Sequence, residues 1–266
     1  MKNLVLVALA ITTLYSCKNQ NKAEDESSLA SEEAAMTTEA TTEAEFNITP
    51  IEHATAIFDF GEDVFYIDPV GGAKAFENKP KPQVVLITDI HGDHLNEETL
   101  TAVADSSTTI FAPQAVVDQL KGAIKEQVTV IANDETQTWD GYTLTAIPMY
   151  NLREEAKQFH TKGRGNGYLI EKDGMRVYFS GDTEDIPEMR NLKDIDKAFI
   201  CMNLPYTMPV TSAADAVIDF KPKEAYPYHF RGQNGLSDVD QFKGIVDSAD
   251  VGTEVIILDW YPNGAE

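Results

Sequence analysis

The sequence predicts a layered α/β sandwich, with strands at its centre and helices covering them. From residue 46 onward, short runs rich in β-branched and aromatic residues alternate with stretches of helical pattern. Several predicted strands come before the first predicted helix, so the fold is not a simple alternation of the two. The run 83–88 is apolar through its centre, which is typical of a strand that is buried on both faces.

Each strand is predicted where β-branched and aromatic residues cluster between turn-forming residues. In chain order, the predicted strands cover residues 53–60, 64–68, 83–88, 127–131, 142–149, 167–171, 176–180, 198–202, 224–228 and 254–259. The predicted helices cover residues 96–104, 113–120, 212–220 and 238–248. Between the strands 167–171 and 176–180, Asp173-Gly174 predicts a tight hairpin, because glycine adopts a positive φ without steric cost.

The composition indicates a globular domain and disfavours one class of partner. With 42% hydrophobic and 24% charged residues, the chain can build a sizeable core. Its 44 acidic and 21 basic residues give a net charge of −23. Because a nucleic-acid-binding protein needs a basic surface, we expect no nucleic-acid partner.

The first 17 residues are predicted to be an export signal. They begin with Lys2, continue through an apolar stretch, residues 4–15, and end at Cys17. This stretch is shorter than the roughly 20 residues that a helix needs to cross a bilayer. A small residue, Ser16, before Cys17 resembles the lipobox of bacterial lipoproteins, which implies cleavage before Cys17 and a lipid on its sulfur. A plain secreted protein is the alternative, because Tyr15 is bulky for that motif.

Residues 18–45 are predicted to be an acidic, disordered spacer, since they lack aromatic residues and cannot build a core. The folded domain is then expected at residues 46–266. Together these predictions describe an exported protein that a lipid anchors to the bacterial envelope, on its periplasmic or surface face. Cys201 would have no disulfide partner if Cys17 carries lipid.

All five histidines lie at or beside the ends of predicted strands, where loops commonly carry functional sites. The densest cluster of polar residues follows the buried strand 83–88 and contains Asp89, His91, Asp93 and His94. Imidazole and carboxylate groups are the ligands that zinc and related divalent ions take. The cluster therefore predicts a metal site.

The motif Asp89-x-His91-x-Asp93-His94 resembles the His-x-His-x-Asp-His signature of the metallo-β-lactamase superfamily, with Asp89 in place of the first histidine. Further segments resemble the family pattern in the same order: 159–170, which contains His160, the strand end 181–183, which contains Asp182, and 226–229, which ends in His229. The segments 53–57 and 66–69 are similar to the branch that includes ascorbate-6-phosphate lactonase. The resemblance implies a four-layer αββα sandwich.

The resemblance also implies a hydrolase with two divalent metal ions, acting on a small ester, lactone, amide or phosphodiester. It assigns Asp89, His91 and His160 to one ion, Asp93, His94 and His229 to the other, and Asp182 to both, with Asp93 also catalytic. A water held by two such ions loses a proton near neutral pH and becomes a nucleophile. Zinc is the expected metal, and the oxygen ligand at Asp89 suits iron or manganese as well.

Four further residues are candidates for binding a small-molecule substrate. Lys162 and Arg164 follow His160 closely and would bring positive charge to the site, unless they belong to a solvated loop. Asn203 and Tyr206 follow a predicted strand and would orient substrate or shape the turn.

Two alternatives stay open at the level of sequence. His53 has no place in the implied ligand set, so a structural or supporting role is expected for it. The replacement at Asp89 also allows a non-catalytic envelope lipoprotein that keeps this fold and binds metal or another ligand, or a site with a single ion.

Overall fold

The structure is a computed structural model that describes residues 46–262. The export signal, Cys17 and the acidic spacer, all predicted within residues 1–45, lie outside the described residues. Among the residues that are described, no helix has both the length and the apolar character that a membrane span requires.

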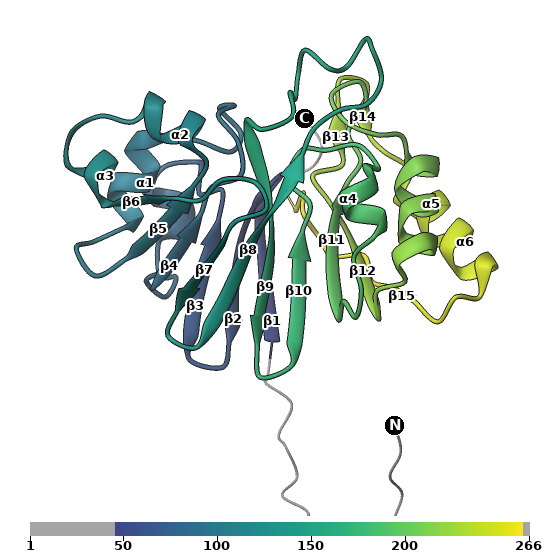
Figure 1. Cartoon of the computed structure of the whole chain (residues 1–266), viewed down its shortest axis with the longest axis horizontal. Coiled ribbons are helices and arrows are strands. Elements are labelled where there is room, and N and C mark those ends of the chain that lie inside the picture. Colours follow the sequence, from purple (N-terminus) through teal and green to yellow (C-terminus); the bar gives the residue numbers. More distant parts are fainter. Residues whose placement is uncertain (1–45, 263–266) are drawn as a thin grey trace, which may run out of the picture. The chain divides into compact units, whose positions relative to one another are not determined.

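Two mixed sheets form the centre of the domain (Figure 1). The first sheet contains, in spatial order, β1 (Phe46–Glu52), β2 (Thr55–Phe60), β3 (Asp63–Ile67), β4 (Val84–Leu86), β5 (Thr109–Ala112) and β6 (Val128–Val130). The second contains β15 (Glu254–Val255), β12 (Glu224–Tyr228), β11 (Lys197–Cys201), β10 (Met175–Phe179), β9 (Gly165–Lys172), β8 (Tyr142–Met149) and β7 (Thr136–Trp139). A two-stranded sheet of β13 (Arg231–Gly232) and β14 (Gly235–Leu236) lies apart from both.

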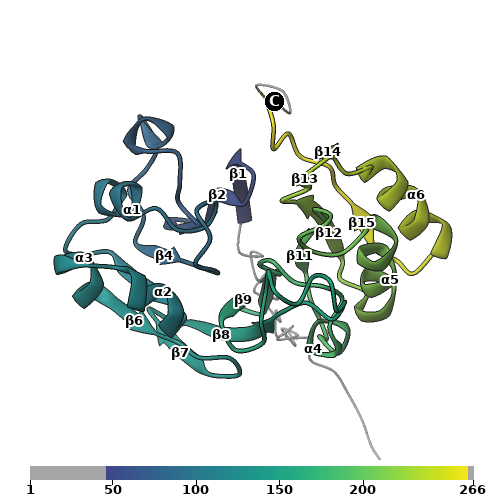
Figure 2. The same ribbon diagram turned by 90° about the horizontal axis from the view of Figure 1, so that it is seen from above.

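Helices cover the outer faces of the two sheets (Figure 2). Beside the first sheet lie η1 (Ala73–Phe76, a 3₁₀ helix), α1 (Glu97–Val103), α2 (Gln114–Gln119) and α3 (Gly122–Gln127). Beside the second lie α4 (Pro187–Arg190), α5 (Val210–Phe220) and α6 (Val239–Ala249). The predicted four-layer αββα sandwich is confirmed.

Both sheets combine an antiparallel half with a parallel half. In the first sheet, β1, β2 and β3 are antiparallel, and β3 to β6 are parallel. In the second, β7 to β10 are antiparallel, whereas β10, β11, β12 and β15 are parallel. The hairpin predicted between β9 and β10 is present, with φ of 50° at Asp173 and 85° at Gly174. Parallel strands require crossover connections, and the helices lie in these connections.

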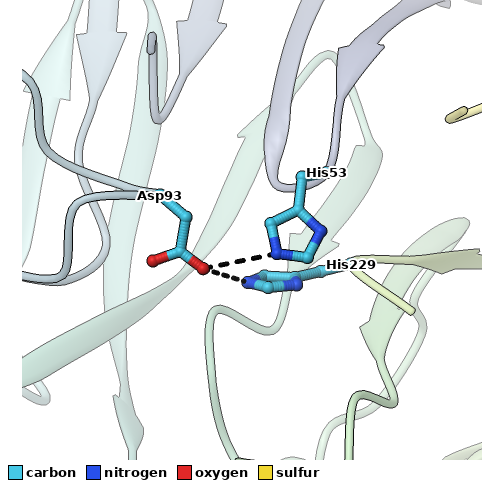
Figure 3. A group of neighbouring side chains, drawn as sticks. All are labelled: His53, Asp93 and His229. Atoms are coloured by element: carbon cyan, nitrogen blue, oxygen red, sulfur yellow. Dashed lines mark ion pairs between the residues drawn. The ribbon is translucent and has the colours of Figure 1, made fainter. Parts of the chain in front are cut away.

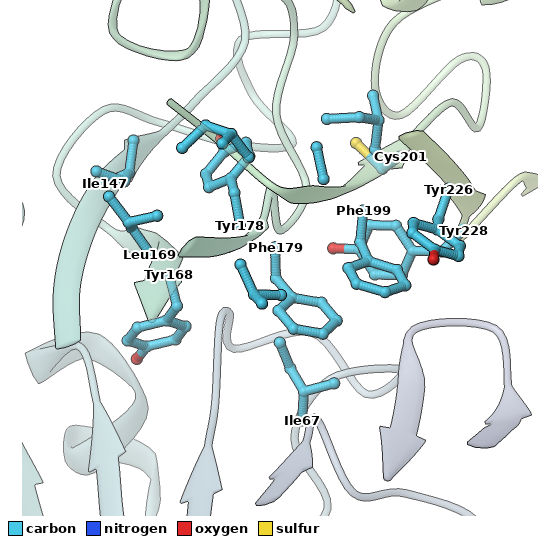
Figure 4. Close-up of a cluster of buried hydrophobic side chains, with 14 of the residues drawn as sticks. Ile67, Ile147, Tyr168, Leu169, Tyr178, Phe179, Phe199, Cys201, Tyr226 and Tyr228 are labelled. Atoms are coloured by element: carbon cyan, nitrogen blue, oxygen red, sulfur yellow. The ribbon is translucent and has the colours of Figure 1, made fainter. Parts of the chain in front are cut away.

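Aromatic rings fill the space between the two sheets (Figure 4). Phe179, Phe199 and Tyr226 stack across neighbouring strands of the second sheet, with centroids 4.3 and 4.6 Å apart. Phe58 of the first sheet meets Phe179 at 4.9 Å. Burying such a side chain contributes roughly 1.5–3 kcal/mol, so this layer holds the sheets in fixed relation.

The structure differs from the sequence-based expectation mainly at sheet edges and in short elements. The strand predicted at 53–60 begins only at Thr55, because His53 belongs to the turn that joins β1 and β2. The last predicted strand, 254–259, is reduced to β15, which is paired over two residues. The elements β1, β5, β7, α3 and α4 were not expected from the sequence.

Candidate metal centre

The predicted ligands meet at one edge of the sandwich, where several strands end. The loop after β4 carries Asp89 to His94, and the loop between β8 and β9 carries His160. Asp182 follows β10, and His229 follows β12. Because these strands belong to both sheets, the seam between the sheets brings together residues that are distant in sequence. The structure places all seven predicted ligands in this cluster.

Four of the five imidazole rings are oriented in the same way, with Nδ1 held by a supporting group and Nε2 directed into the cluster. The groups at Nδ1 are Asp68 Oδ2 for His94 (2.8 Å), the Tyr206 carbonyl oxygen for His160 (3.1 Å), the Asn203 side-chain amide for His229 (3.1 Å) and the Tyr261 hydroxyl for His53 (2.9 Å). Such partners fix the ring orientation of metal-binding histidines in proteins. His91 differs, since its Nδ1 faces Asp89 Oδ2 at 2.8 Å.

Asp182 lies at the centre of the cluster and is almost fully buried. Its Oδ2 is 3.2 Å from His160 Nε2 and 3.3 Å from His94 Nε2, and its Oδ1 is 3.1 Å from His229 Nε2. Burial alone would raise the pKa of the Asp182 carboxyl, but the charges of His229 and His94 outweigh burial and hold that pKa well below its usual range. Asp182 is therefore an anion that faces three imidazoles.

The buried atoms in this cluster fit a metal ion better than they fit one another. Within the described residues, His160 Nε2 and Asp182 Oδ1 are buried and make no hydrogen bond, although each lies 3.1–3.2 Å from another polar atom of the cluster. The Nε2 atoms of His94 and His229 lie 3.1 Å apart. Unpaired buried polar atoms are rare because they lose their hydration. Nitrogen and carboxylate oxygen atoms that converge in this way are the donor set of zinc, iron and manganese sites.

The potential ligand atoms form three groups, in each of which they lie within 4.8 Å of one another: Asp89, His91 and His160; His94, Asp182 and His229; His53, Asp93 and His229. The second and third groups share His229. The first group is the one that the sequence analysis assigned to one ion. The third group differs from the expectation and is shown in Figure 3. His53 Nε2 lies 3.3 Å from Asp93 Oδ2, so His53 reaches the cluster itself.

Asp89 is held by Arg164 through two contacts. The guanidinium Nε and Nη2 donate to Oδ1 and Oδ2 of Asp89 at 3.0 and 2.7 Å. Burial by itself would raise the pKa of Asp89, but His91, His94 and Arg164 together lower it. Asp89 is thus a buried carboxylate with both oxygens engaged, and its Oδ2 is still within 3.8 Å of His160 Nε2.

A cavity of about 310 Å³ opens onto the cluster. Its lining contains four predicted ligands (His91, Asp93, His160, Asp182), two predicted substrate-binding residues (Asn203, Tyr206) and also His53, Phe159 and Arg231. The other two predicted substrate-binding residues have partners elsewhere. Arg164 holds Asp89, and Lys162 Nζ lies 2.6 Å from Glu188 Oε1 and above the Tyr150 ring.

Asp68 and Arg231 were not among the predicted site residues, and His53, for which a structural or supporting role was expected, lies at the cluster. The segment 66–69 contained a signal for Asp68, since a carboxylate at the end of a strand lies where such sites are built. Asp68 is fully buried and supports His94. Arg231, two residues after His229, lines the cavity.

Comparisons with known proteins agree with this architecture. A family model described as "Beta-lactamase superfamily domain" matches residues 58–230. A metal-dependent hydrolase of Thermococcus onnurineus is 29% identical over 207 residues, which cover 74% of this chain and 90% of that protein. A solved structure from Parabacteroides distasonis, described as a metal-dependent hydrolase, superposes with a TM-score of 0.73 at 35% identity. That match covers 82% of this chain and 94% of that one.

A second solved structure, the metallo hydrolase Igni18 of Ignicoccus hospitalis, has a TM-score of 0.66 at 21% identity. The match covers 82% of this chain and 95% of Igni18. At 21% identity, the similarity to Igni18 supports a shared fold.

Proposed function

This chain belongs to the β-lactamase superfamily and is a metal-dependent hydrolase, and we propose that it hydrolyses a small ester, lactone, amide or phosphodiester at the cluster described above. The residues that would hold two divalent ions are Asp89, His91 and His160 on one side, His94, His229 and Asp93 on the other, and Asp182 between them. Bound ions would supply an acidified water and a Lewis acid for the bond under attack. Zinc suits this donor set, as do iron and manganese.

One observation carries the proposal. Three imidazole Nε2 atoms lie 3.1–3.3 Å from the buried Asp182 carboxylate, while the Nδ1 atom of each ring is held by another group. Rings that are fixed in this way cannot turn away when the cluster is empty, so the protein keeps its ligands prearranged for a metal. The cavity beside them admits a small molecule.

The segments 53–57 and 66–69 support a placement near the branch that includes ascorbate-6-phosphate lactonase. Both segments contribute to the site, His53 through Asp93 and Asp68 through His94. We also propose export and anchoring to the envelope by lipid on Cys17, on the basis of the apolar N-terminus and its Ser16-Cys17 end.

Metal analysis of the purified protein tests the proposal before any substrate is known. Protein prepared without chelator should contain up to two transition-metal ions per chain. Asp182→Asn keeps the shape of the side chain but removes its charge, and should lower that content. Asp185→Asn, which changes a partly buried ion pair with Arg190 close to Asp182 in the sequence, serves as the matched control. A wild type that holds no metal even after reconstitution would contradict the proposal.

A second candidate function is favoured by the contacts of Asp89. Because Arg164 occupies both of its oxygens, the cluster can also be read as a single-ion or ligand-binding site in a non-catalytic lipoprotein. Screening the metal-loaded protein against lactones, phosphodiesters, esters and β-lactams separates the two functions. Turnover that disappears in Asp182→Asn supports the enzyme, whereas full metal loading with no turnover of any class supports the binding protein.

A further inference from the structure

We propose that the substrate carries an oxyanion, a carboxylate or a phosphate, which Arg231 binds, and an apolar part that packs against Phe159 and Tyr206. This inference rests on the proposed hydrolytic function and adds a substrate class to it. It follows from the charged and the aromatic residues that line the cavity.

Arg231 is held beside the His53 side of the cluster. Its backbone N–H donates to the Tyr261 hydroxyl at 3.1 Å, and the same hydroxyl is 2.9 Å from His53 Nδ1. The guanidinium lies 5.1 Å from the centre of the Tyr261 ring, at the distance of a cation–π contact. Because backbone and side chain both contact Tyr261, the position of the Arg231 cation is coupled to that of His53.

The guanidinium of Arg231 is loosely paired compared with that of Arg164. Its carboxylate partner among the described residues is Glu52, whose Oε1 lies 3.4 and 3.5 Å from the two Nη atoms. Glu52 is also more than half exposed to solvent. Charge-assisted contacts of arginine are normally near 2.7–2.9 Å, as the 2.7 Å contact of Arg164 with Asp89 is. An incoming anion can therefore replace Glu52 at little cost.

The charge of the cavity makes this cation distinctive. Among the residues that line the cavity, Arg231 is the one with a permanent positive charge, and Asp93 and Asp182 are carboxylates. The whole chain has a net charge of −23, so an anion approaching the protein meets a repulsive field over most of its surface. A fixed guanidinium at the cavity wall gives an oxyanion a defined place to bind beside the metal ions that the cluster would hold.

The part of the cavity beside His160 is aromatic. Phe159 and Tyr206 meet edge to face with centroids 5.2 Å apart, and Phe159 precedes His160 in the chain. Tyr206 is partly exposed, and its carbonyl oxygen is the one that contacts His160 Nδ1. Rings in this arrangement offer an apolar surface to a flat or aliphatic group. A substrate that contacts both Arg231 and these rings would lie in the cavity that opens onto the cluster.

Calorimetric binding to the metal-loaded full-length protein tests this without requiring turnover. The probes are benzoate and phenyl phosphate, with neutral benzamide as the matched ligand. Wild type should prefer the anions, and Arg231→Met should reduce that preference about tenfold, the size expected for losing charge-assisted hydrogen bonds at a partly exposed site. Arg231→Lys should retain part of the preference, because lysine keeps the positive charge but lacks the planar guanidinium that donates two parallel hydrogen bonds. Which of the two anions binds more tightly identifies the oxyanion.

Arg176→Met is the control, since it removes the same charge from a pair with Glu171 on β9 and β10, away from the cavity. It should leave the preference for the anions unchanged. Two results would overturn the proposal: a wild type that binds benzamide as tightly as both anions, or a preference that Arg231→Met and Arg176→Met reduce equally.

Hydrolysis of 4-acetoxybenzoate and of its neutral methyl ester tests the anion site at Arg231 separately from the proposed hydrolytic function. The ratio of the two kcat/KM values should fall about tenfold in Arg231→Met. If both esters are hydrolysed and the ratio does not change, the anion site is refuted and hydrolysis stands. If neither ester is hydrolysed while the anion preference in binding depends on Arg231, ester hydrolysis is refuted and the anion site stands.

Discussion

Asp89 occupies the position at which the superfamily signature has a histidine, and its replacement changes the charge of the cluster by one unit. Arg164 compensates this difference in charge, because its guanidinium makes two contacts with the Asp89 carboxylate. The pair as a whole is neutral, as a histidine ligand is. The aspartate at position 89 is visible in the sequence, but its pairing with Arg164 is not, since the two residues are 75 positions apart.

Restoring histidine at this position should therefore harm the protein. Asp89→His leaves the Arg164 guanidinium, whose side chain is 17% exposed, without its carboxylate. Losing one partner of a buried pair costs about 3–5 kcal/mol, and the remaining exposure of Arg164 places the expected loss near the lower end. Urea unfolding of the metal-free protein measures this loss.

The double variant Asp89→His/Arg164→Leu tests the reason for the loss. It removes the unpaired cation, so it should recover a substantial part of the stability that Asp89→His loses. Equal stability of the single and double variants would show that the Arg164 charge is not what the substitution exposes.

At this same scale, the residues that sequence motifs singled out lie together in the cluster, whereas His53, which was not assigned to the ligand set, meets it only in space. Asp89 to His94 form one compact motif, and Asp182 ends a strand in a Gly-Asp-Thr segment. His53 lies in the segment 53–57, which supplied no ligand in the sequence prediction. It reaches Asp93 because the turn between β1 and β2 lies over the cluster, where His53 also packs against the His229 ring at 3.8 Å.

Among the elements, the β13–β14 hairpin depends on a close backbone contact. A Cβ atom at Gly232 would lie 2.0 Å from the carbonyl oxygen of Leu204, which is main chain and cannot rotate away. Gly232→Ala should therefore displace the hairpin that carries Arg231 and destabilise the protein by about 1–3 kcal/mol, the usual cost of overpacking. The midpoint of denaturant unfolding measures the effect.

Gly244→Ala is the matched control for this prediction. Gly244 lies within α6, and a Cβ atom there would meet nothing within 4 Å. The same chemical change should stabilise the protein by about 0.5–1 kcal/mol, because alanine loses less conformational freedom in a helix. If both variants change stability in the same direction, the close contact at Leu204 does not constrain the hairpin.

The elements that the sequence predicted well are those with a strong pattern of burial. Strands β8 and β12 have the bounds that were expected, and both are largely buried. Edge strands were missed for a physical reason. In β1 and β7, every residue is exposed or only partly buried, and β1 contains Pro50, which weakens the strand signal. In contrast, β5 is buried but only four residues long, too short for its period to stand out.

At the scale of the whole molecule, the proposed cellular location rests on the N-terminal sequence alone. If Cys17 carries lipid, Cys17→Ser should release the protein from the membrane fraction or block its processing. Metal content should not change, because every proposed ligand lies in the domain from His53 to His229. Fractionation and the mass of the mature protein provide the measurement. A mutant with wild-type membrane association and the same mature mass would show that no lipid is attached there.

The division of the cluster between the two sheets also sets a time for its completion. His94 and His229, whose Nε2 atoms lie 3.1 Å apart, are separated by 135 residues. A ribosome adding about 5–20 residues per second makes them roughly 7 to 27 seconds apart. Until β12 has been made and has joined its sheet, no ion can be held by both histidines. If the chain crosses a membrane before it folds, the metal it carries is chosen from the ions of the compartment it enters, not from those of the one in which it was synthesised.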